Sequence, residues 1–111
     1  MGRYYPICLS LERKLCLVVG GGAVAQRKVQ SLLDVGAGVT VVSPEFCDDL
    51  LRLDGVTRIE RRFEEGDVAG AFLVYAATND AALNSAVATA ARKQGALVNV
   101  VDTPAECDFI V

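Results

Sequence analysis

The sequence contains no histidine, and its four cysteines are widely separated and form no C-x-x-C pair. Zinc sites draw on histidine or on closely spaced cysteines, so we expect no metal site. Isolated cysteines of this kind are typical of a reduced, cytoplasmic protein. No uninterrupted apolar run has the length of a membrane span, and the first residues lack the apolar core of a signal peptide. We therefore predict a cytoplasmic protein with no membrane partner.

Positive charge is also scarce, because 11 lysines and arginines stand against 14 acidic residues, for a net charge of −3. This balance argues against nucleic acid as a default partner. A chain of 111 residues is large enough for one domain with a real core, but it is small for a complete enzyme. We interpret residues 1–111 as a single domain.

The sequence does contain a βαβ pattern around a glycine triplet. The apolar run Leu15–Val19 predicts a strand buried on both faces, and Gly20–Gly22 ends it. Apolar residues then recur at helical spacing up to Gly36, and a second β-branched run follows at Val39–Val42. The residues with helical spacing are Val24, Val29, Leu32 and Leu33. Glycines at the first turn of such a unit are the arrangement that binds a dinucleotide.

The turn reads as G-x-G-x-x-A, with Gly20, Gly22 and Ala25 in the three defining positions. Gly20 permits a tight exit from the strand, and Gly22 leaves room for a pyrophosphate to approach the backbone. Ala25 is small enough for the helix to pack closely on the sheet. The N–H groups around Gly22, Ala23 and Val24 are predicted to face the phosphates, at the positive end of the helix dipole.

Strands and helices alternate along the rest of the chain. We predict further strands at 56–61, 72–77 and 96–101, and helices at 46–53 and 80–94. An edge strand is expected at 5–11, and another strand begins at 109–111, where we expect the natural protein to continue. The alternation predicts a Rossmann-like α/β fold, with a doubly wound, mostly parallel sheet and helices on both faces.

In such a sheet the ligand lies beyond the carboxyl ends of the strands, which places Ser43, Pro44 and Glu45 near the cofactor. Glu45 either holds the adenosine ribose or is a solvated carboxylate that opens a helix, and both interpretations stay open. No arginine lies between Ser43 and Leu51 to receive a 2′-phosphate, which favours NAD over NADP.

Polar residues after the later strands also have two interpretations each. The backbone at Thr78 is expected to line the cofactor groove, whereas Asp80 is expected chiefly to cap the next helix. Asn99 lies within an apolar strand and needs a hydrogen-bonding partner, either in the protein or in the cofactor. Asp102 either begins a turn or acts as a general base toward a substrate beside the nicotinamide.

The chain has two basic pairs. For Arg27-Lys28 we favour a solvent-facing pair over a phosphate contact. For Arg61-Arg62 we also favour a solvated pair, although an anionic substrate would give it a use.

Three stretches together resemble the precorrin-2 dehydrogenases of siroheme synthesis, and the resemblance covers essentially the whole chain. The stretches are GGG-x-V-A-x-R-K at Gly20–Lys28, A-A-T-N-D at Ala76–Asp80, and N-V-V-D-x-P with C-D-F within Asn99–Phe109. The family includes bifunctional enzymes that also insert iron and the amino-terminal part of multifunctional siroheme synthases.

This resemblance implies NAD-dependent removal of hydrogen from precorrin-2, giving sirohydrochlorin, with ferrous iron insertion following in some members. The family's carboxylate implicated in both steps falls on Asp102, and its cofactor contacts fall on Gly20–Val24 and on Ser43–Glu45. Family members continue with a dimerisation region and a helical domain, so we expect a homodimer for the complete protein and little catalysis by this part alone.

NAD-sensing regulatory domains of potassium transport systems are the main alternative, since they share the glycine turn and act without chemistry. In those domains an acidic residue usually ends the second strand, and N-V-V-D-x-P has no counterpart. Ser43-Pro44 and Asn99–Pro104 therefore favour the dehydrogenase. A non-catalytic Rossmann domain that only positions a substrate domain is a third possibility.

Overall fold

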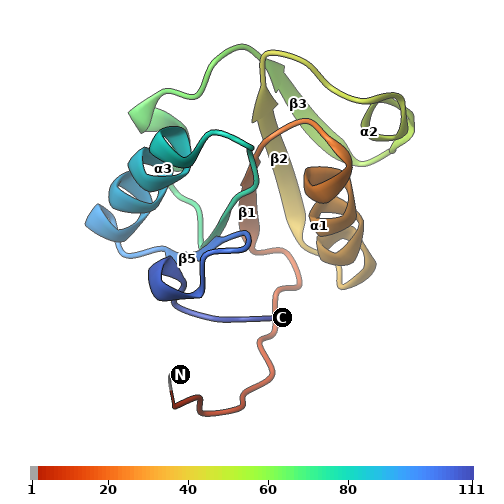
Figure 1. The fold of residues 1–111 in the computed structure, drawn as a ribbon. Coiled ribbons are helices and arrows are strands. Elements are labelled where there is room, and N and C mark those ends of the chain that lie inside the picture. The colour runs from red at the N-terminus through yellow and green to blue at the C-terminus, as the bar shows by residue number, and fades with distance from the viewer. Residues whose placement is uncertain (1–2) are drawn as a thin grey trace.

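The computed structural model describes residues 3–111, which form one parallel sheet with helices on both faces (Figure 1). The strand order is β3-β2-β1-β4-β5, and every neighbouring pair is parallel. The strands are β1 (Leu15–Val19), β2 (Gly38–Ser43), β3 (Val56–Glu60), β4 (Leu73–Ala76) and β5 (Leu97–Val100). The order reverses direction at β1, as a doubly wound sheet requires. The predicted fold class is thus confirmed.

The helices separate onto the two faces of this sheet. Helices α1 (Ala23–Asp34) and α2 (Asp48–Arg52) cover one face, and α3 (Ala81–Lys93) covers the other (Figure 1). Two short 3₁₀ turns, η1 (Glu65–Val68) and η2 (Pro104–Glu106), complete the structure. Each face therefore has its own apolar core, which explains why the central strands are apolar on both sides.

Strand β1 shows how one short sequence serves both cores. Leu17 and Val19 point into the core under α3, whereas Cys16 and Val18 point into the core under α1. None of the four is more than 2% exposed. Burial raises the pKa of the Cys16 thiol to about 11, which keeps it protonated at neutral pH.

Two predicted strands are absent from the structure of the described residues. Residues 5–11 run as an exposed irregular segment, because their weak alternation finds no strand to pair with. Residues 109–111 are also irregular, since the outer edge of β5 is already occupied by side chains. The Asp108 carboxylate accepts from Val98 N at 3.0 Å, and Cys107 Sγ accepts from Val100 N at 3.2 Å.

The other predicted elements are confirmed, with shifts of a few residues at their ends. The short helix predicted at 46–53 is limited to Asp48–Arg52. Asp80 caps α3 as predicted, because its carboxylate accepts a hydrogen bond from Leu83 N at 3.1 Å. Within residues 3–111, no helix combines the length and the hydrophobicity that crossing a membrane would require.

Candidate cofactor site

The turn after β1 needs glycine at its first position for steric reasons. Gly20 has a φ of +139°, and a Cβ there would overlap the carbonyl oxygen of Ala77, which follows β4. The Gly20 N–H donates to the carbonyl of Val42 at 3.0 Å, which ties the turn to β2. Ala25, on the side of α1 that packs on the sheet, is completely buried and faces the same glycine. This geometry is consistent with the predicted tight exit from the strand at Gly20 and with the predicted close packing of the helix at Ala25.

Gly22 is placed differently, since a Cβ at this position would meet nothing within 4 Å. The first backbone bond of α1 runs from Gln26 N to the Gly22 carbonyl at 2.9 Å. The N–H groups of Ala23, Val24 and Ala25 meet no acceptor among residues 3–111, and the first turn of α1 carries no acidic side chain. Free donors, open space and the positive end of a helix dipole together suit a phosphate group.

Gly21 was predicted only as part of the Gly20–Val24 turn and was given no role of its own, yet it fixes the other wall of the site. A Cβ on Gly21 would overlap the carbonyl oxygen of Glu45 and approach Ser43 Oγ to 2.7 Å. The Gly21 carbonyl also accepts from Cys47 N at 2.7 Å. The loop after β2 is therefore held directly against the glycine turn. The signal in the sequence was that the middle position of the turn is also glycine.

A hollow lies between this loop and the start of α1. It is lined by Gly21, Gly22 and residues 43–47, so it contains the predicted residues Ser43, Pro44 and Glu45. Glu45 is exposed there, and its backbone N–H bonds to Ser43 Oγ at 3.4 Å. Glu45 does not open a helix, because α2 begins only at Asp48. The ribose contact of Glu45 stays a prediction.

A second hollow lies on the other side of Ser43 and Pro44. It also contains Gly20 and Thr78, and Arg62 and Phe63 line it from the segment after β3. Ser43 and Pro44 thus form a wall between two hollows that both adjoin the glycine turn. The structure brings the predicted residues from the ends of β1, β2 and β4 to one edge of the sheet.

The loop after β4 is fixed by Asn84, a residue that sequence reasoning missed. Asn84 is 6% exposed, and all of its side-chain bonds go to Thr78. Its Oδ1 accepts from Thr78 N at 3.2 Å and from Thr78 Oγ1 at 2.6 Å, and its Nδ2 donates to Thr78 O at 3.0 Å. The signal was a polar residue within the apolar stripe of the predicted helix.

A third hollow lies between α1 and the turn after β5. Val24, Asn99 and Asp102 line it, as do Arg27 and Lys28 from α1. The Asn99 side chain donates to the carbonyl of Phe109 at 2.9 Å and is buried, so the structural bridge is the interpretation that the structure shows. Asp102 is exposed at the tip of a turn with a φ of +59°, which confirms its turn-forming role.

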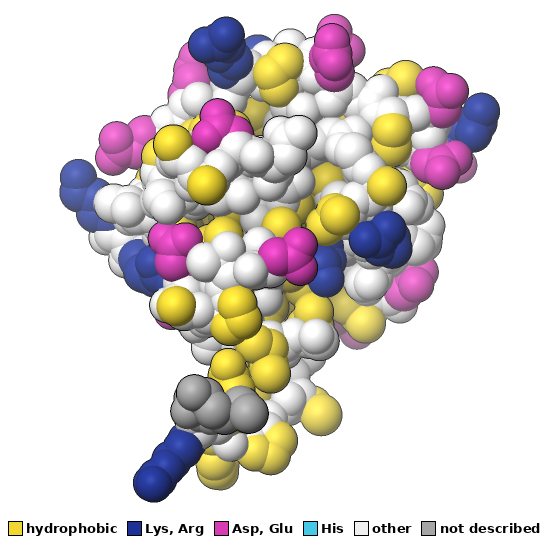
Figure 2. Space-filling model, viewed as in Figure 1, with side chains coloured by type: hydrophobic (Ala, Val, Ile, Leu, Met, Phe, Trp, Pro, Cys, Tyr) yellow, Lys and Arg dark blue, Asp and Glu magenta, His cyan; other side chains and the backbone are white. Residues whose placement is uncertain are grey.

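Arg27 of the basic pair of α1 is exposed, as the solvent-facing interpretation expects, and both residues of the pair line the hollow that contains Asp102. Lys28 is half-buried, with its ammonium 5.5 Å from the centre of the Tyr75 ring. Figure 2 shows dark-blue side chains over α1 close to a magenta side chain, with yellow apolar side chains beside them. This juxtaposition of opposite charges was not predicted.

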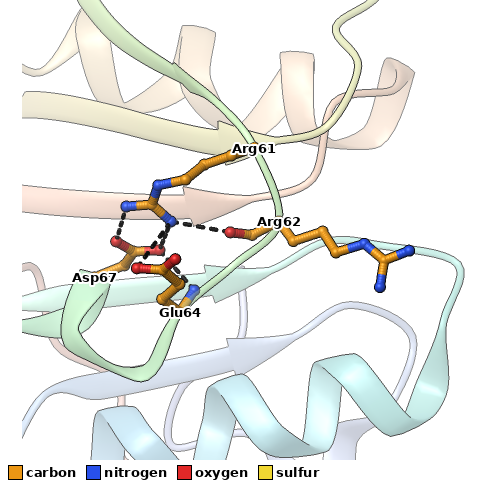
Figure 3. A network of polar contacts seen from close by, with 4 residues as sticks. All are labelled: Arg61, Arg62, Glu64 and Asp67. Atoms are coloured by element: carbon orange, nitrogen blue, oxygen red, sulfur yellow. Dashed lines mark hydrogen bonds and ion pairs between the residues drawn. The ribbon is translucent and has the colours of Figure 1, made fainter.

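The second basic pair divides into two roles, which corrects the expectation of a solvated pair (Figure 3). Arg61 binds the Asp67 carboxylate with both terminal nitrogens, at 2.9 and 2.6 Å, and lies 3.8 Å from Glu64. The hydrogen bond from Arg61 lowers the pKa of Asp67, assisted by a bond from the Glu64 N–H at 2.8 Å. Arg62 points away from this cluster and stays exposed (Figure 3).

The fold and the glycine turn together define a dinucleotide-binding domain of the Rossmann type. Residues 7–111 match the family described as "Putative NAD(P)-binding", and the chain belongs to this family. The predicted dinucleotide cofactor is thereby confirmed.

Named relatives make the comparison more specific. The chain is 50% identical over 110 residues to a siroheme synthase of Methylococcus capsulatus, covering 96% of this chain and 23% of that protein. It is 45% identical to the siroheme synthase of Nitrosomonas eutropha, with 97% and 24% coverage. The chain thus spans about a quarter of the curated relatives it matches.

A solved structure agrees with these relatives. The structure of SirC, a precorrin-2 dehydrogenase, superposes with a TM-score of 0.86 at 29% sequence identity. The match covers 97% of this chain and 54% of SirC. The resemblance noted from the motifs is therefore confirmed, both in sequence and in fold.

Proposed function

We propose that the complete protein dehydrogenates precorrin-2 to sirohydrochlorin with NAD, and that this chain is its NAD-binding domain. The observation that carries the proposal is the position of Asp102, which lines a hollow together with Val24 of the first turn of α1. The names of the relatives, siroheme synthase and precorrin-2 dehydrogenase, support the same reaction. They favour it over the NAD-sensing regulatory domain considered above.

The residues at the carboxyl edge fit the proposed cofactor. The free N–H groups of Ala23 and Val24 would hold the pyrophosphate, and Gly22 leaves the space for it. Ser43, Pro44 and Glu45 would surround the adenosine ribose. NAD supplies a hydride acceptor when bound. Glu45 favours NAD over NADP, because its carboxylate would repel a 2′-phosphate.

Two further residues complete the proposed cofactor site. The backbone at Thr78 lines the hollow beside Ser43, and Asn84 keeps that backbone in one position. Asn99 lines the hollow that contains Asp102, but its amide group is engaged with Phe109. We therefore assign Asn99 the task of shaping the site through the segment that follows η2.

Asp102 is proposed to accept the proton that precorrin-2 loses. Its side chain is exposed in the hollow and forms no hydrogen bond or ion pair with residues 3–111. A free carboxylate is available as a general base, whereas a paired one would first have to leave its partner. The dehydrogenation removes one proton and one hydride, so a base beside the cofactor is needed.

The proposal extends to the complete protein in three respects. Because the relatives are named siroheme synthases, insertion of ferrous iron into sirohydrochlorin is a second candidate activity. Here iron is a substrate and not a resident cofactor. We also propose a homodimer, as the family resemblance implies, and a cytoplasmic location, which the isolated cysteines favour.

The direct test follows sirohydrochlorin formation from precorrin-2 and NAD by absorbance, with the complete protein beside residues 1–111. Turnover by the complete protein, with NAD binding but no turnover by residues 1–111, is the expected result. Absence of turnover by the complete protein, with NAD still bound, would reject the dehydrogenase and favour the regulatory alternative. Addition of ferrous iron to the product then tests chelation separately.

A further inference from the structure

Two cations line the hollow between α1 and the turn after β5 without a carboxylate partner. Within residues 3–111, neither Arg27 nor Lys28 lies within 4.0 Å of an acidic side chain. Four other cations, Arg52, Arg61, Arg92 and Lys93, do have such partners. The remaining lysines and arginines of residues 3–111 have none, so what sets Arg27 and Lys28 apart is their place in the hollow. The charge of Arg27 and Lys28 is therefore available to a ligand.

Lys28 contacts an aromatic ring rather than a carboxylate. Its ammonium lies 5.5 Å from the centre of the Tyr75 ring, and Tyr75 is only 4% exposed. The Tyr75 ring packs edge-on against Phe109, with 5.6 Å between the ring centres. A cation over an aromatic face is attracted to it but is not neutralised. Lys28 is thus oriented toward this side of the molecule as a free positive charge.

The hollow consequently has two sides of opposite charge. The α1 side carries Arg27 and Lys28, and the side formed by the turn after β5 carries Asp102. Between them the lining is mixed, with apolar residues such as Val24, Val101 and Ile110 beside the polar Asn99 and Thr103. A ligand that fits must place negative groups against α1 and an uncharged part near Asp102.

We propose that Arg27 and Lys28 form a subsite for carboxylate side chains of a macrocyclic substrate. This inference rests on the proposed function, since precorrin-2 carries acetate and propionate side chains around a largely apolar ring. Holding these side chains against α1 would turn the reacting edge of the ring toward Asp102.

The pyrophosphate of the cofactor is the rival ligand for these cations. However, Gly22 and the loop after β2 line a different hollow, which contains neither Arg27 nor Lys28. The free N–H groups at the start of α1 already provide donors for phosphate. The geometry therefore places the two cations on the substrate side of α1.

The test uses the complete protein with Arg27→Gln, Lys28→Gln and the double substitution. Removing one charge is expected to raise KM for precorrin-2 and Kd for sirohydrochlorin about tenfold. The Kd for NAD should change by less than about twofold. Lys14→Gln is the matched control, because Lys14 lies 5.2 Å from the Phe72 ring centre in a similar contact but precedes β1 at the opposite edge.

Each outcome decides between the proposals. Unchanged sirohydrochlorin affinity in Lys28→Gln, or an equal loss in Lys14→Gln, would overturn the subsite. A large loss of NAD affinity in Lys28→Gln would assign the cation to the cofactor and overturn it as well. The wild-type protein could also bind sirohydrochlorin more tightly than Lys28→Gln and yet fail to dehydrogenate precorrin-2. That result would support the subsite and reject the proposed function. If the wild-type protein does not bind sirohydrochlorin, both fail.

Discussion

The turn after β1 and the turn after β5 lie at the same edge of the sheet, but they are built in opposite ways. The first is shaped by the backbone, because side chains at Gly20 or Gly21 would overlap neighbouring carbonyl oxygens. The second has a backbone bond from Thr103 N to the Val100 carbonyl at 3.1 Å, and it relies in addition on side chains. Cys107 and Asp108 bond to the backbone of β5 and leave Asp102 free. The comparison indicates that the turn after β1 is a rigid binding site for a cofactor, whereas the turn after β5 presents a reactive group.

The largest effect is expected from removing the charge of Asp102. Asp102→Asn in the complete protein should lower kcat for dehydrogenation by about 10²- to 10⁴-fold, as for other lost general bases. Asparagine also tolerates the φ of +59°, so the turn should be retained. Steady-state kinetics and calorimetric titration with NAD measure the two quantities, and the Kd for NAD should not change.

This prediction tests whether the second turn has a chemical role at all. Glu106→Gln is a suitable control, because Glu106 lies in the adjacent 3₁₀ turn and bonds to Ser85 at 3.0 Å. Normal turnover in Asp102→Asn would show that Asp102 only forms the turn. The turn after β5 would then present no reactive group.

A charge in the glycine turn should abolish cofactor binding without unfolding the chain. Gly22→Asp would place a carboxylate where the pyrophosphate is proposed to bind, and we expect NAD affinity to fall by about 100-fold or more. Because a Cβ at Gly22 meets nothing within 4 Å, the fold should tolerate the change. Circular dichroism verifies folding, and retained NAD affinity in the folded variant would contradict the site assignment.

Substitution of the neighbouring Gly21 should instead lower the stability of the fold. Gly21→Ala would force the loop after β2 to move away from the turn, at a cost of about 1–3 kcal/mol in the free energy of unfolding. Gly22→Ala has space and should cost well under that amount. Urea unfolding of the two variants compares them directly. Equal losses would show that the turn is less rigid than its contacts indicate.

The sequence was sufficient to predict both turns, but not the side-chain contacts that hold the segment after β5. Periodicity and glycine spacing report on buried strands and on close backbone contacts, so β1, α1 and the tight turn at Gly20 could be predicted. Whether Asn99 bonds to protein or to cofactor depends on where residue Phe109 lies, and no local pattern encodes that.

Long-range contacts account for the other failures. Arg27 and Lys28 line the same hollow as Asp102 only because the fold places α1 opposite the turn after β5, although the two are distant in the sequence. The predicted strand at 109–111 failed because the hydrogen-bonding groups of β5 bind the Cys107 and Asp108 side chains. Sequence reasoning could have flagged only Asn84, as a polar residue in an apolar stripe.

Asn84 offers a smaller test of how side chains build the edge of the sheet. Asn84→Ala leaves Thr78 N without its acceptor and should cost about 1–3 kcal/mol of stability. NAD affinity should fall as well, because the backbone at Thr78 lines the proposed site. Asn79→Ala, at an exposed position in the same loop, is the control and should be nearly neutral. An Asn84→Ala variant with wild-type stability and affinity would remove Asn84 from the site.

The smallest effect concerns the Arg61–Asp67 pair, which lies outside the two turns. The hydrogen bond from Arg61 lowers the pKa of Asp67 in the folded protein, so its contribution to stability is present above the unfolded value of about 3.9. That contribution is lost as the pH falls through the lower, folded value. Asp67→Asn should therefore be less stable than the wild type at pH 7, and the difference should narrow below about pH 4.

Urea unfolding at a series of pH values measures this difference. Asp49→Asn is the matched control, because Asp49 pairs with Arg52 at 3.1 Å but both side chains are more than 70% exposed. An exposed pair contributes little, so this variant should follow the wild type at every pH. If Asp67→Asn behaved in the same way, the segment after β3 would be held by its apolar contacts at Phe63 and Val68 rather than by the ion pair. Arg62 would then be positioned beside Ser43 by packing alone.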